Sequence, residues 1–230
     1  MKPVLEVDSL TFAYDSAHPV LDGITFAVLE GECVGIVGAN AAGKSTLLWC
    51  LLGLLKAAGN VRFFGEELRR RNLARIGVVF QNPEDHLFMP RLMDDITLPL
   101  VNRGMSAALA AQRASAALES VGLGDMLHRP ASQLSLGERK RAAIAAVLAG
   151  SPDLLLLDEP TAELDGRAVR QLAGVLQGLT MARVIASHDL GFFRGLAERI
   201  LVLAKGKVVA EGPASQILAD RALLEEAGLV

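Results

Sequence analysis

The sequence predicts an α/β protein with a mainly parallel central sheet. Two observations predict this class. Short apolar runs alternate along the chain with stretches of helical spacing, and a glycine-rich loop lies between one such run and the helix that follows it. Alternating strands and helices are typical of parallel sheets that helices cover on both faces.

Four continuous apolar runs predict the parallel strands: 32–38 ("ECVGIVG"), 75–80 ("RIGVVF"), 152–159 ("PDLLLLDE") and 182–189 ("ARVIASHD"). These runs lack the alternation of a strand that has one wet face. We therefore expect them to be buried on both faces.

The two ends of the chain show other strand patterns. Residues 5–14 ("LEVDSLTFAY") and 24–31 ("ITFAVLEG") come closer to alternation, so we expect a small antiparallel β layer at the N-terminus. Residues 199–212 ("RILVLAKGKVVAEG") indicate a hairpin in which Gly206 supplies the turn.

The segment between the second and third buried runs is helical in character. It contains the alanine-rich stretch 106–122 ("SAALAAQRASAALESVG") and few β-branched runs. We expect a helical subdomain, roughly residues 82–150, inserted in a single domain of residues 1–230. No internal repeat or Ser/Gly linker indicates two tethered domains.

Composition indicates a globular chain. It has 230 residues, 51% of them hydrophobic, and we expect Cys33 and Cys50 in the core. The net charge of −3 provides no large basic field, so nucleic acid is not expected as a partner. The N-terminus lacks a secretory pattern, and the longest apolar stretch, 47–55, is expected to be a buried helix. We therefore expect a cytoplasmic protein that can dock on a membrane protein.

The glycine-rich stretch 38–46 ("GANAAGKST") matches the phosphate-loop pattern G-x-x-x-x-G-K-[ST]. Its backbone amides are expected to face phosphates, Lys44 to reach the terminal phosphates, and Ser45 to bind the accompanying Mg²⁺. The fold class is therefore that of a P-loop NTPase core. The expected binding residues of the loop are Gly38, Asn40, Ala41, Ala42, Gly43, Lys44, Ser45 and Thr46.

Two acidic residues close the third buried run. Asp158 lies at the C-terminal end of that strand, the edge where open α/β sheets bind ligands, and is expected to hold the metal. Glu159 can polarise a water for attack on the terminal phosphate. The alternative for Glu159 is an ordinary loop or helix-entry carboxylate.

The stretch 133–146 ("QLSLGERKRAAIAA") begins a helix, and Ser135 and Glu138 have the spacing of a capping box. The same residues could contact a substrate, because a capped helix N-terminus concentrates backbone donors and partial positive charge. The two roles are compatible.

Five motifs in one order resemble the nucleotide-binding subunit of ABC transporters: "GANAAGKST", "VVFQNPED", "LSLGERKR", "LLLLDEPTAELD" and "VIASHDL". The resemblance covers almost the whole chain and implies ATP hydrolysis with Mg²⁺. It makes 38–46 the Walker A loop, Gln81 the Q-loop glutamine, 134–138 the signature, 154–159 the Walker B strand, 162–165 the D-loop and His188 the switch histidine.

The resemblance also implies roles for single residues. Gln81 would bind Mg²⁺, although it could simply end a strand. His188 would contact the terminal phosphate and orient the attacking water, although it could be a satisfied histidine at a strand end or belong to an Asx-type turn with Asp189. Tyr14 would stack on adenine rather than pack within its sheet. Asp165 would cap a helix and also lie at a dimer interface. The remaining histidines, His18, His86 and His128, are expected at the surface, with His86 in the segment that faces a membrane partner.

One phosphate loop cradles only one side of the transferred phosphate, so the other side must be closed by another element. In ABC proteins the signature of a second subunit does this. Ser135, Gly137 and Glu138 would thus bind the ATP held by a second copy of the chain, or by a similar ATPase subunit, in a head-to-tail dimer.

Three longer segments look like the energy-coupling factor (ECF) class, especially ATPases of cobalt and nickel uptake: 76–88, 93–106 and 212–229. The implied partners are a transmembrane coupling subunit and a substrate-specific membrane protein. The alternatives are an importer of another substrate such as a vitamin, a soluble ABC ATPase, or a nucleotide-binding regulatory module without turnover.

The chain departs from the family pattern at Ala41, Leu136 and Glu138, where glycine, glycine and glutamine are usual. A side chain at Ala41 makes a positive φ costly, so the loop either avoids that conformation or is strained. The other two departures could slow hydrolysis or alter the choice of partner.

Overall fold

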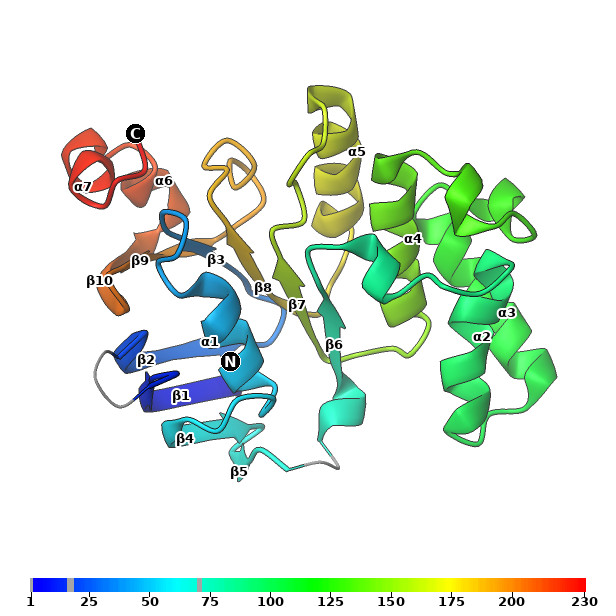
Figure 1. Ribbon diagram of the computed structural model, residues 1–230, viewed down its shortest axis with the longest axis horizontal. Coiled ribbons are helices and arrows are strands. Elements are labelled where there is room, and N and C mark those ends of the chain that lie inside the picture. The colour runs from blue at the N-terminus through cyan, green and yellow to red at the C-terminus, as the bar shows by residue number, and fades with distance from the viewer. Residues whose placement is uncertain (1, 16–18, 70–71) are drawn as a thin grey trace.

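The computed structural model describes residues 2–15, 19–69 and 72–230, and it contains two sheets flanked by helices (Figure 1). The larger sheet has the strand order β10-β9-β3-β8-β7-β6. Four adjacent pairs in it are parallel and only β9 with β10 is antiparallel, which confirms the mainly parallel sheet and the C-terminal hairpin. Its strands are β3 (Cys33–Val37), β6 (Ile76–Val79), β7 (Leu154–Asp158), β8 (Ala182–Ser187), β9 (Arg199–Ala204) and β10 (Lys207–Pro213).

The smaller sheet is antiparallel, as expected, and has the order β2-β1-β4-β5. Its strands are β1 (Pro3–Phe12), β2 (Leu21–Leu29), β4 (Ala58–Phe63) and β5 (Glu66–Glu67). The sequence did not predict the last two. Most of their residues are exposed, so strand pairing, of β4 with β1 and of β5 with β4, defines them rather than an apolar pattern.

The parallel sheet has a separate hydrophobic core on each face, because successive strand residues point to opposite sides. From β3, Val34 and Ile36 pack with the small sheet and α1 (Lys44–Leu51), whereas Cys33 and Val37 pack on the other face. Cys33 and Cys50 are buried, as predicted, and burial raises the pKa of each thiol to about 11.

The stretch 47–55 is only partly a buried helix. Helix α1 ends at Leu51, since Gly53 adopts a positive φ of 68° that the helix cannot continue through, and Leu54 is exposed. None of the helices in the described part of the chain is long and apolar enough to cross a membrane.

Three helices between β6 and β7 lie on the side of the large sheet away from the small sheet: α2 (Leu92–Asn102), α3 (Ala107–Ser120) and α4 (Leu136–Leu148) (Figure 1). Their core is continuous with that of the sheet, and treating them as a subdomain of residues 82–150 stays a prediction. The other helices are α5 (Gly166–Gln177), α6 (Ala214–Ile217), α7 (Arg221–Glu226) and the 3₁₀ turns η1 (Leu73–Arg75), η2 (Pro83–Asp85), η3 (Gly124–Met126) and η4 (Ala131–Gln133).

Candidate nucleotide-binding site

The glycine-rich loop joins the C-terminal end of β3 to α1. Two positions in it require glycine. A Cβ on Gly38 would lie 2.5 Å from the carbonyl oxygen of Leu203, and Gly43, directly before α1, has φ +104°. Glycine at position 38 therefore allows β9 to pack directly against the backbone of this loop.

Ala41 adopts the left-handed conformation, with φ +64°. The sequence left open whether the loop avoids this conformation, and the structure shows that it does not. A left-handed non-glycine residue costs about 1–2 kcal/mol, so the loop carries local strain.

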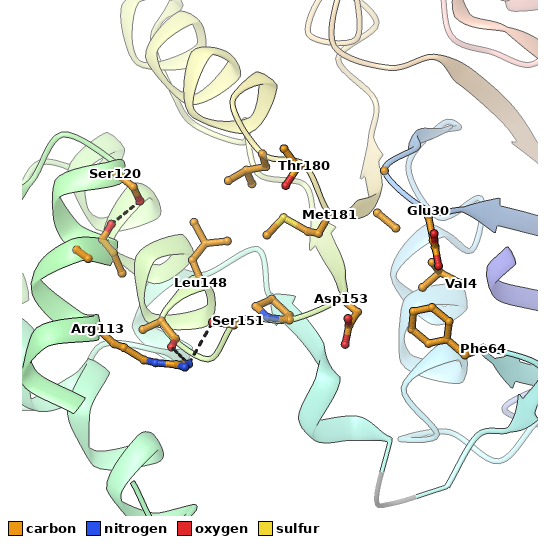
Figure 2. Close-up of a pocket in the computed structure, with 17 residues that line it drawn as sticks. Val4, Glu30, Phe64, Arg113, Ser120, Leu148, Ser151, Asp153, Thr180 and Met181 are labelled. Atoms are coloured by element: carbon orange, nitrogen blue, oxygen red, sulfur yellow. Dashed lines mark hydrogen bonds between the residues drawn. The ribbon is translucent and has the colours of Figure 1, made fainter. Parts of the chain in front are cut away.

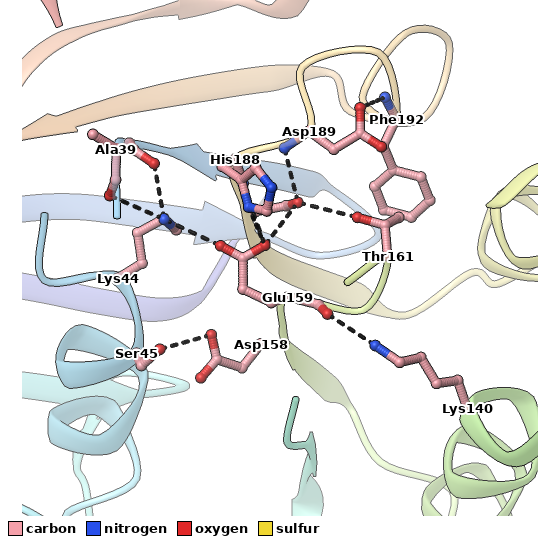
Figure 3. A network of polar contacts seen from close by, with 12 residues as sticks. Ala39, Lys44, Ser45, Lys140, Asp158, Glu159, Thr161, His188, Asp189 and Phe192 are labelled. Atoms are coloured by element: carbon pink, nitrogen blue, oxygen red, sulfur yellow. Dashed lines mark hydrogen bonds and ion pairs between the residues drawn. The ribbon is translucent and has the colours of Figure 1, made fainter. Parts of the chain in front are cut away.

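Lys44 is buried and three groups hold its ammonium (Figure 3). Its Nζ donates to the carbonyl oxygens of Gly38 at 2.8 Å and Ala39 at 3.2 Å, and lies 3.1 Å from Glu159 Oε1. The loop therefore folds back over its own lysine and brings it to the end of β7.

Ser45 donates a hydrogen bond from Oγ to Asp158 Oδ1 at 3.0 Å. Burial raises the pKa of Asp158, and the hydrogen bond from Ser45 partly opposes that shift. A hydroxyl and a carboxylate suit Mg²⁺, which prefers oxygen ligands and usually keeps several waters. Within the described residues no group of three acidic, histidine or cysteine side chains forms a complete metal cage, so phosphate and water oxygens would complete the set.

Glu159 directly follows β7 and contacts the residues at the C-terminal end of the neighbouring strand β8. Its Oε2 lies 2.9 Å from His188 Nδ1, and it accepts hydrogen bonds from Ser187 Oγ at 3.2 Å and from the His188 backbone N–H at 3.4 Å. Asp189 instead accepts from the backbone of Phe192. The His188 side chain therefore pairs with the glutamate and not with Asp189.

A cavity of about 570 Å³ unites most of the predicted residues. Tyr14 stands at its rim, 61% exposed, with its hydroxyl 3.4 Å from Thr46 Oγ1 and its ring edge-on to Phe12. Gly38, Ala42 and Asp158 are buried and do not line it. The lining residues are Tyr14, Val20, Asn40, Ala41, Gly43, Lys44, Ser45, Thr46, Gln81, Glu159, Ala162 and His188.

The signature residues lie elsewhere, around a second cavity of about 400 Å³ that shares no lining residue with the first. Ser135 caps α4 in a capping box: its Oγ accepts from the Glu138 backbone, and Glu138 Oε2 accepts from the Ser135 N–H and Oγ. These hydrogen bonds lower the pKa of Glu138. Leu136, Gly137 and Asp165 also line this cavity, and Asp165 caps α5 through Ala168, as predicted.

A larger cavity, about 710 Å³, is not this site (Figure 2). It lies by the N-terminal ends of β7 and β8, where Arg113 donates to Ser151 Oγ at 3.1 Å. None of the predicted site residues lines it. A choice of site by cavity volume alone would therefore favour the N-terminal edge of the strands over the edge where the predicted residues lie.

The sequence missed two residues that form hydrogen bonds with Glu159, and it wrongly placed His86, which lies outside this network, at the surface. Ser187, which ends β8, donates to Glu159, and Lys140 of α4 donates to the Glu159 carbonyl oxygen. The only sequence signal for Ser187 was its position directly before His188. No sequence signal marked Lys140. His86 was expected at the surface, but it is half-buried, stacks on Phe80 and accepts from the Phe80 N–H at 3.1 Å.

The predictions for the other two histidines have different outcomes. His128 is exposed, as expected. His18 lies outside the described residues.

The fold and the loop define a P-loop nucleotide-binding protein. The family model described as "ABC transporter" matches residues 21–162. The chain belongs to this family and is an ATP-binding, ATP-hydrolysing subunit, which confirms the resemblance seen in the motifs.

Relatives of known name are similar over the full chain. The energy-coupling factor transporter ATP-binding protein EcfA of Carboxydothermus hydrogenoformans is 40% identical over 100% of this chain and 87% of its own. The cobalt import ATP-binding protein CbiO of Rhodobacter capsulatus is 39% identical over 100% and 85%. The structure of CbiO1 from Clostridium perfringens, part of the ABC transporter complex CbiONQ, superposes with TM-score 0.88 at 30% identity, covering 100% of this chain and 96% of that one.

Proposed function

We propose that the chain is the ATP-hydrolysing subunit of an ECF-type ABC importer that drives uptake of a transition-metal ion, cobalt or nickel. The convergence of Lys44, Ser45, Glu159 and His188 on one cavity carries the hydrolytic part of this proposal. The relatives named EcfA and CbiO support the class of transporter and its substrate.

Each side chain has a distinct role at this cavity. Lys44 binds the terminal phosphates, which replace Glu159 as the partner of its ammonium. Ser45, Gln81 and Asp158 hold Mg²⁺, which neutralises phosphate charge when bound. Glu159 takes a proton from the attacking water, and His188 orients that water and contacts the terminal phosphate. Tyr14 stacks on adenine.

The active unit is a head-to-tail dimer. Ser135, Gly137 and Glu138 line a cavity of their own, so they reach an ATP molecule only when it belongs to another subunit. The capped N-terminus of α4 supplies backbone donors for the terminal phosphate. The partner is a second copy of this chain or a similar ATPase subunit.

A groove of about 290 Å³ between β6, α2 and α4 fits the transmembrane coupling subunit. Phe88 is 72% exposed beside it. Asp95 is buried there, accepts from the Phe88 and Met89 N–H groups through Oδ1, and has no hydrogen-bond partner for Oδ2 among the described residues. A helix that offers an apolar side chain and a hydrogen-bond donor satisfies both features. This docking places the chain on the cytoplasmic face of the membrane, with a substrate-specific membrane protein in the complex.

Purification of the chain from its native membrane in detergent tests the transporter assignment. The expected result is co-purification of integral membrane proteins, and uptake of Co²⁺ or Ni²⁺ by vesicles that contain the complex and ATP. Co-purification with uptake of a vitamin instead would replace the substrate but retain the class. A chain that hydrolyses ATP without any membrane partner would favour a soluble ABC ATPase.

A further inference from the structure

A buried lysine of α4 contacts the backbone of Glu159. Lys140 is 5% exposed, and its Nζ donates to the Glu159 carbonyl oxygen at 3.2 Å (Figure 3). Its hydrogen-bond partner is a neutral carbonyl. Burial lowers the pKa of the ammonium, and the negative charges of Glu163 and Glu159 partly oppose that shift. Burying an ammonium is costly even with these charges nearby, so core packing alone does not favour lysine at this position.

The backbone of Glu159 needs support, because its φ is +44°. A non-glycine residue in this region costs about 1–3 kcal/mol and persists only where its surroundings hold it. The Glu159 N–H donates to the Ala186 carbonyl oxygen at 2.8 Å, and its own carbonyl oxygen accepts from the Ala162 N–H at 3.1 Å. Among the described residues, Lys140 is the second donor to that oxygen and the one that comes from the helical segment.

Lys140 connects this backbone to the signature. Ser135 caps α4 five residues before it, which is about 7.5 Å along the helix axis. A helix over so short a distance moves as a unit. A displacement of the capped end therefore moves the ammonium, and with it the carbonyl that orients Glu159.

We propose that Lys140 is a positioning residue that couples engagement of the signature by a partner subunit's ATP to the orientation of Glu159 in its own chain. This proposal rests on the head-to-tail dimer of the proposed function. The signature of each chain serves the opposite ATP, whereas the glutamate serves its own. Lys140 thus links the two ATP sites of the dimer within one polypeptide.

The substitution Lys140→Met removes the donor and keeps most of the side chain's length. We expect kcat for ATP hydrolysis to fall about 10-fold or more, because small displacements of reacting groups cost at least that much, while the Kd for a fluorescent ATP analogue changes less than about twofold. Lys56→Met, at an exposed position, is the matched control and should retain wild-type kcat. Wild-type kcat in Lys140→Met would overturn the proposal.

Mixed dimers of differently tagged copies separate positioning of Glu159 from general support of the signature. In the first, one copy carries Lys140→Met together with Glu159→Gln and the other is wild type. In the second, the two substitutions are on different copies. If Lys140 acts on its own Glu159, the first dimer keeps one intact site and hydrolyses in a single turnover, while the second has both sites impaired.

A lysine that merely supports the signature predicts the opposite order, because its loss would damage the site of the other copy. Higher activity of the second dimer, or equal activity of the two, would overturn the proposal. If Lys140→Met is insoluble, Lys140→Gln replaces it in both dimers with the same expected order. Absence of ATP-dependent dimerisation of the wild-type chain, both with itself and with a similar ATPase subunit, would instead overturn the head-to-tail dimer of the proposed function.

Discussion

Lys44 Nζ lies 3.1 Å from Glu159 Oε1, so the lysine of the phosphate loop and the carboxylate after β7 form a buried ion pair. A phosphate that binds Lys44 must compete with Glu159 for the same ammonium. Loading of the loop and release of the glutamate toward water are therefore linked by one contact.

Glu159→Gln should keep ATP binding and stop turnover. The amide cannot accept a proton from water, so we expect hydrolysis to fall at least about 100-fold, while ATP accumulates in a trapped dimer. Steady-state phosphate release and gel filtration with ATP measure the two effects. Glu225→Gln on α7 is a control that should behave as wild type, and unchanged hydrolysis in Glu159→Gln would refute the assigned base.

Lys44→Ala should lose nucleotide affinity by about 100-fold or more, since a charge-assisted contact to the terminal phosphates disappears. It should also lower the free energy of unfolding by about 3 kcal/mol, because Glu159 is left buried without its cation. Titration with a fluorescent ATP analogue and urea denaturation test these effects. The double variant Lys44→Ala/Glu159→Gln should recover part of the stability but none of the affinity; equal stability of the single and double variants would contradict the ion-pair argument.

Ala41→Gly should stabilise the protein. It removes a left-handed cost of about 1–2 kcal/mol but increases the entropy of the unfolded chain by about 0.4–1 kcal/mol, which leaves a net gain of roughly 0.5–1 kcal/mol. Ala42→Gly in the same loop has no positive φ to relieve and should be destabilising by a similar amount. Urea midpoints of the two variants should therefore move in opposite directions.

Two substitutions of Ser135 should separate its role as a helix cap from its role in binding ATP. Ser135→Ala should lower the free energy of unfolding by about 1 kcal/mol and Ser135→Gly by only a few tenths. Both variants lack the hydroxyl, so both should impair ATP-driven dimerisation to the same degree. Dimerisation that follows the order of stability, rather than loss of the hydroxyl, would reduce Ser135 to a helix cap.

We expect the contribution of Asp158 to the free energy of unfolding to fall as pH rises. Its folded-state pKa is raised by burial, so the folded state holds this proton more tightly than the unfolded state does. The stabilising effect of the proton is present in acid and is lost as pH rises from the ordinary carboxyl range through the folded pKa. Asp158→Asn should thus be about 1 kcal/mol more stable than wild type at neutral pH, with Mg²⁺-dependent hydrolysis lost. Urea titrations at several pH values should show that this advantage shrinks in acid.

Local sequence was sufficient for the parts of the protein that depend on spacing and periodicity. The continuous apolar runs predicted β3, β6, β7 and β8, because strands buried on both faces need no polar positions. The capping box at Ser135 and the cap at Asp165 were also predicted, since a cap joins residues three apart. The phosphate loop was evident for the same reason.

Only the tertiary structure decided which distant groups share the site. β7 and β8 pair in register, and this pairing sets Glu159 against Ser187 and His188, almost thirty residues along the chain. β4 and β5 were missed because pairing of β4 with β1 and of β5 with β4, not an apolar pattern, defines them. Lys140 was missed because a lysine in an amphipathic helix ordinarily faces water. The sequence by itself determined the class of protein and its motifs, whereas packing determined the strain at Ala41 and Glu159, the burial of Lys140 and the separation of the two cavities. Those features arise from contacts between segments, which no local pattern records.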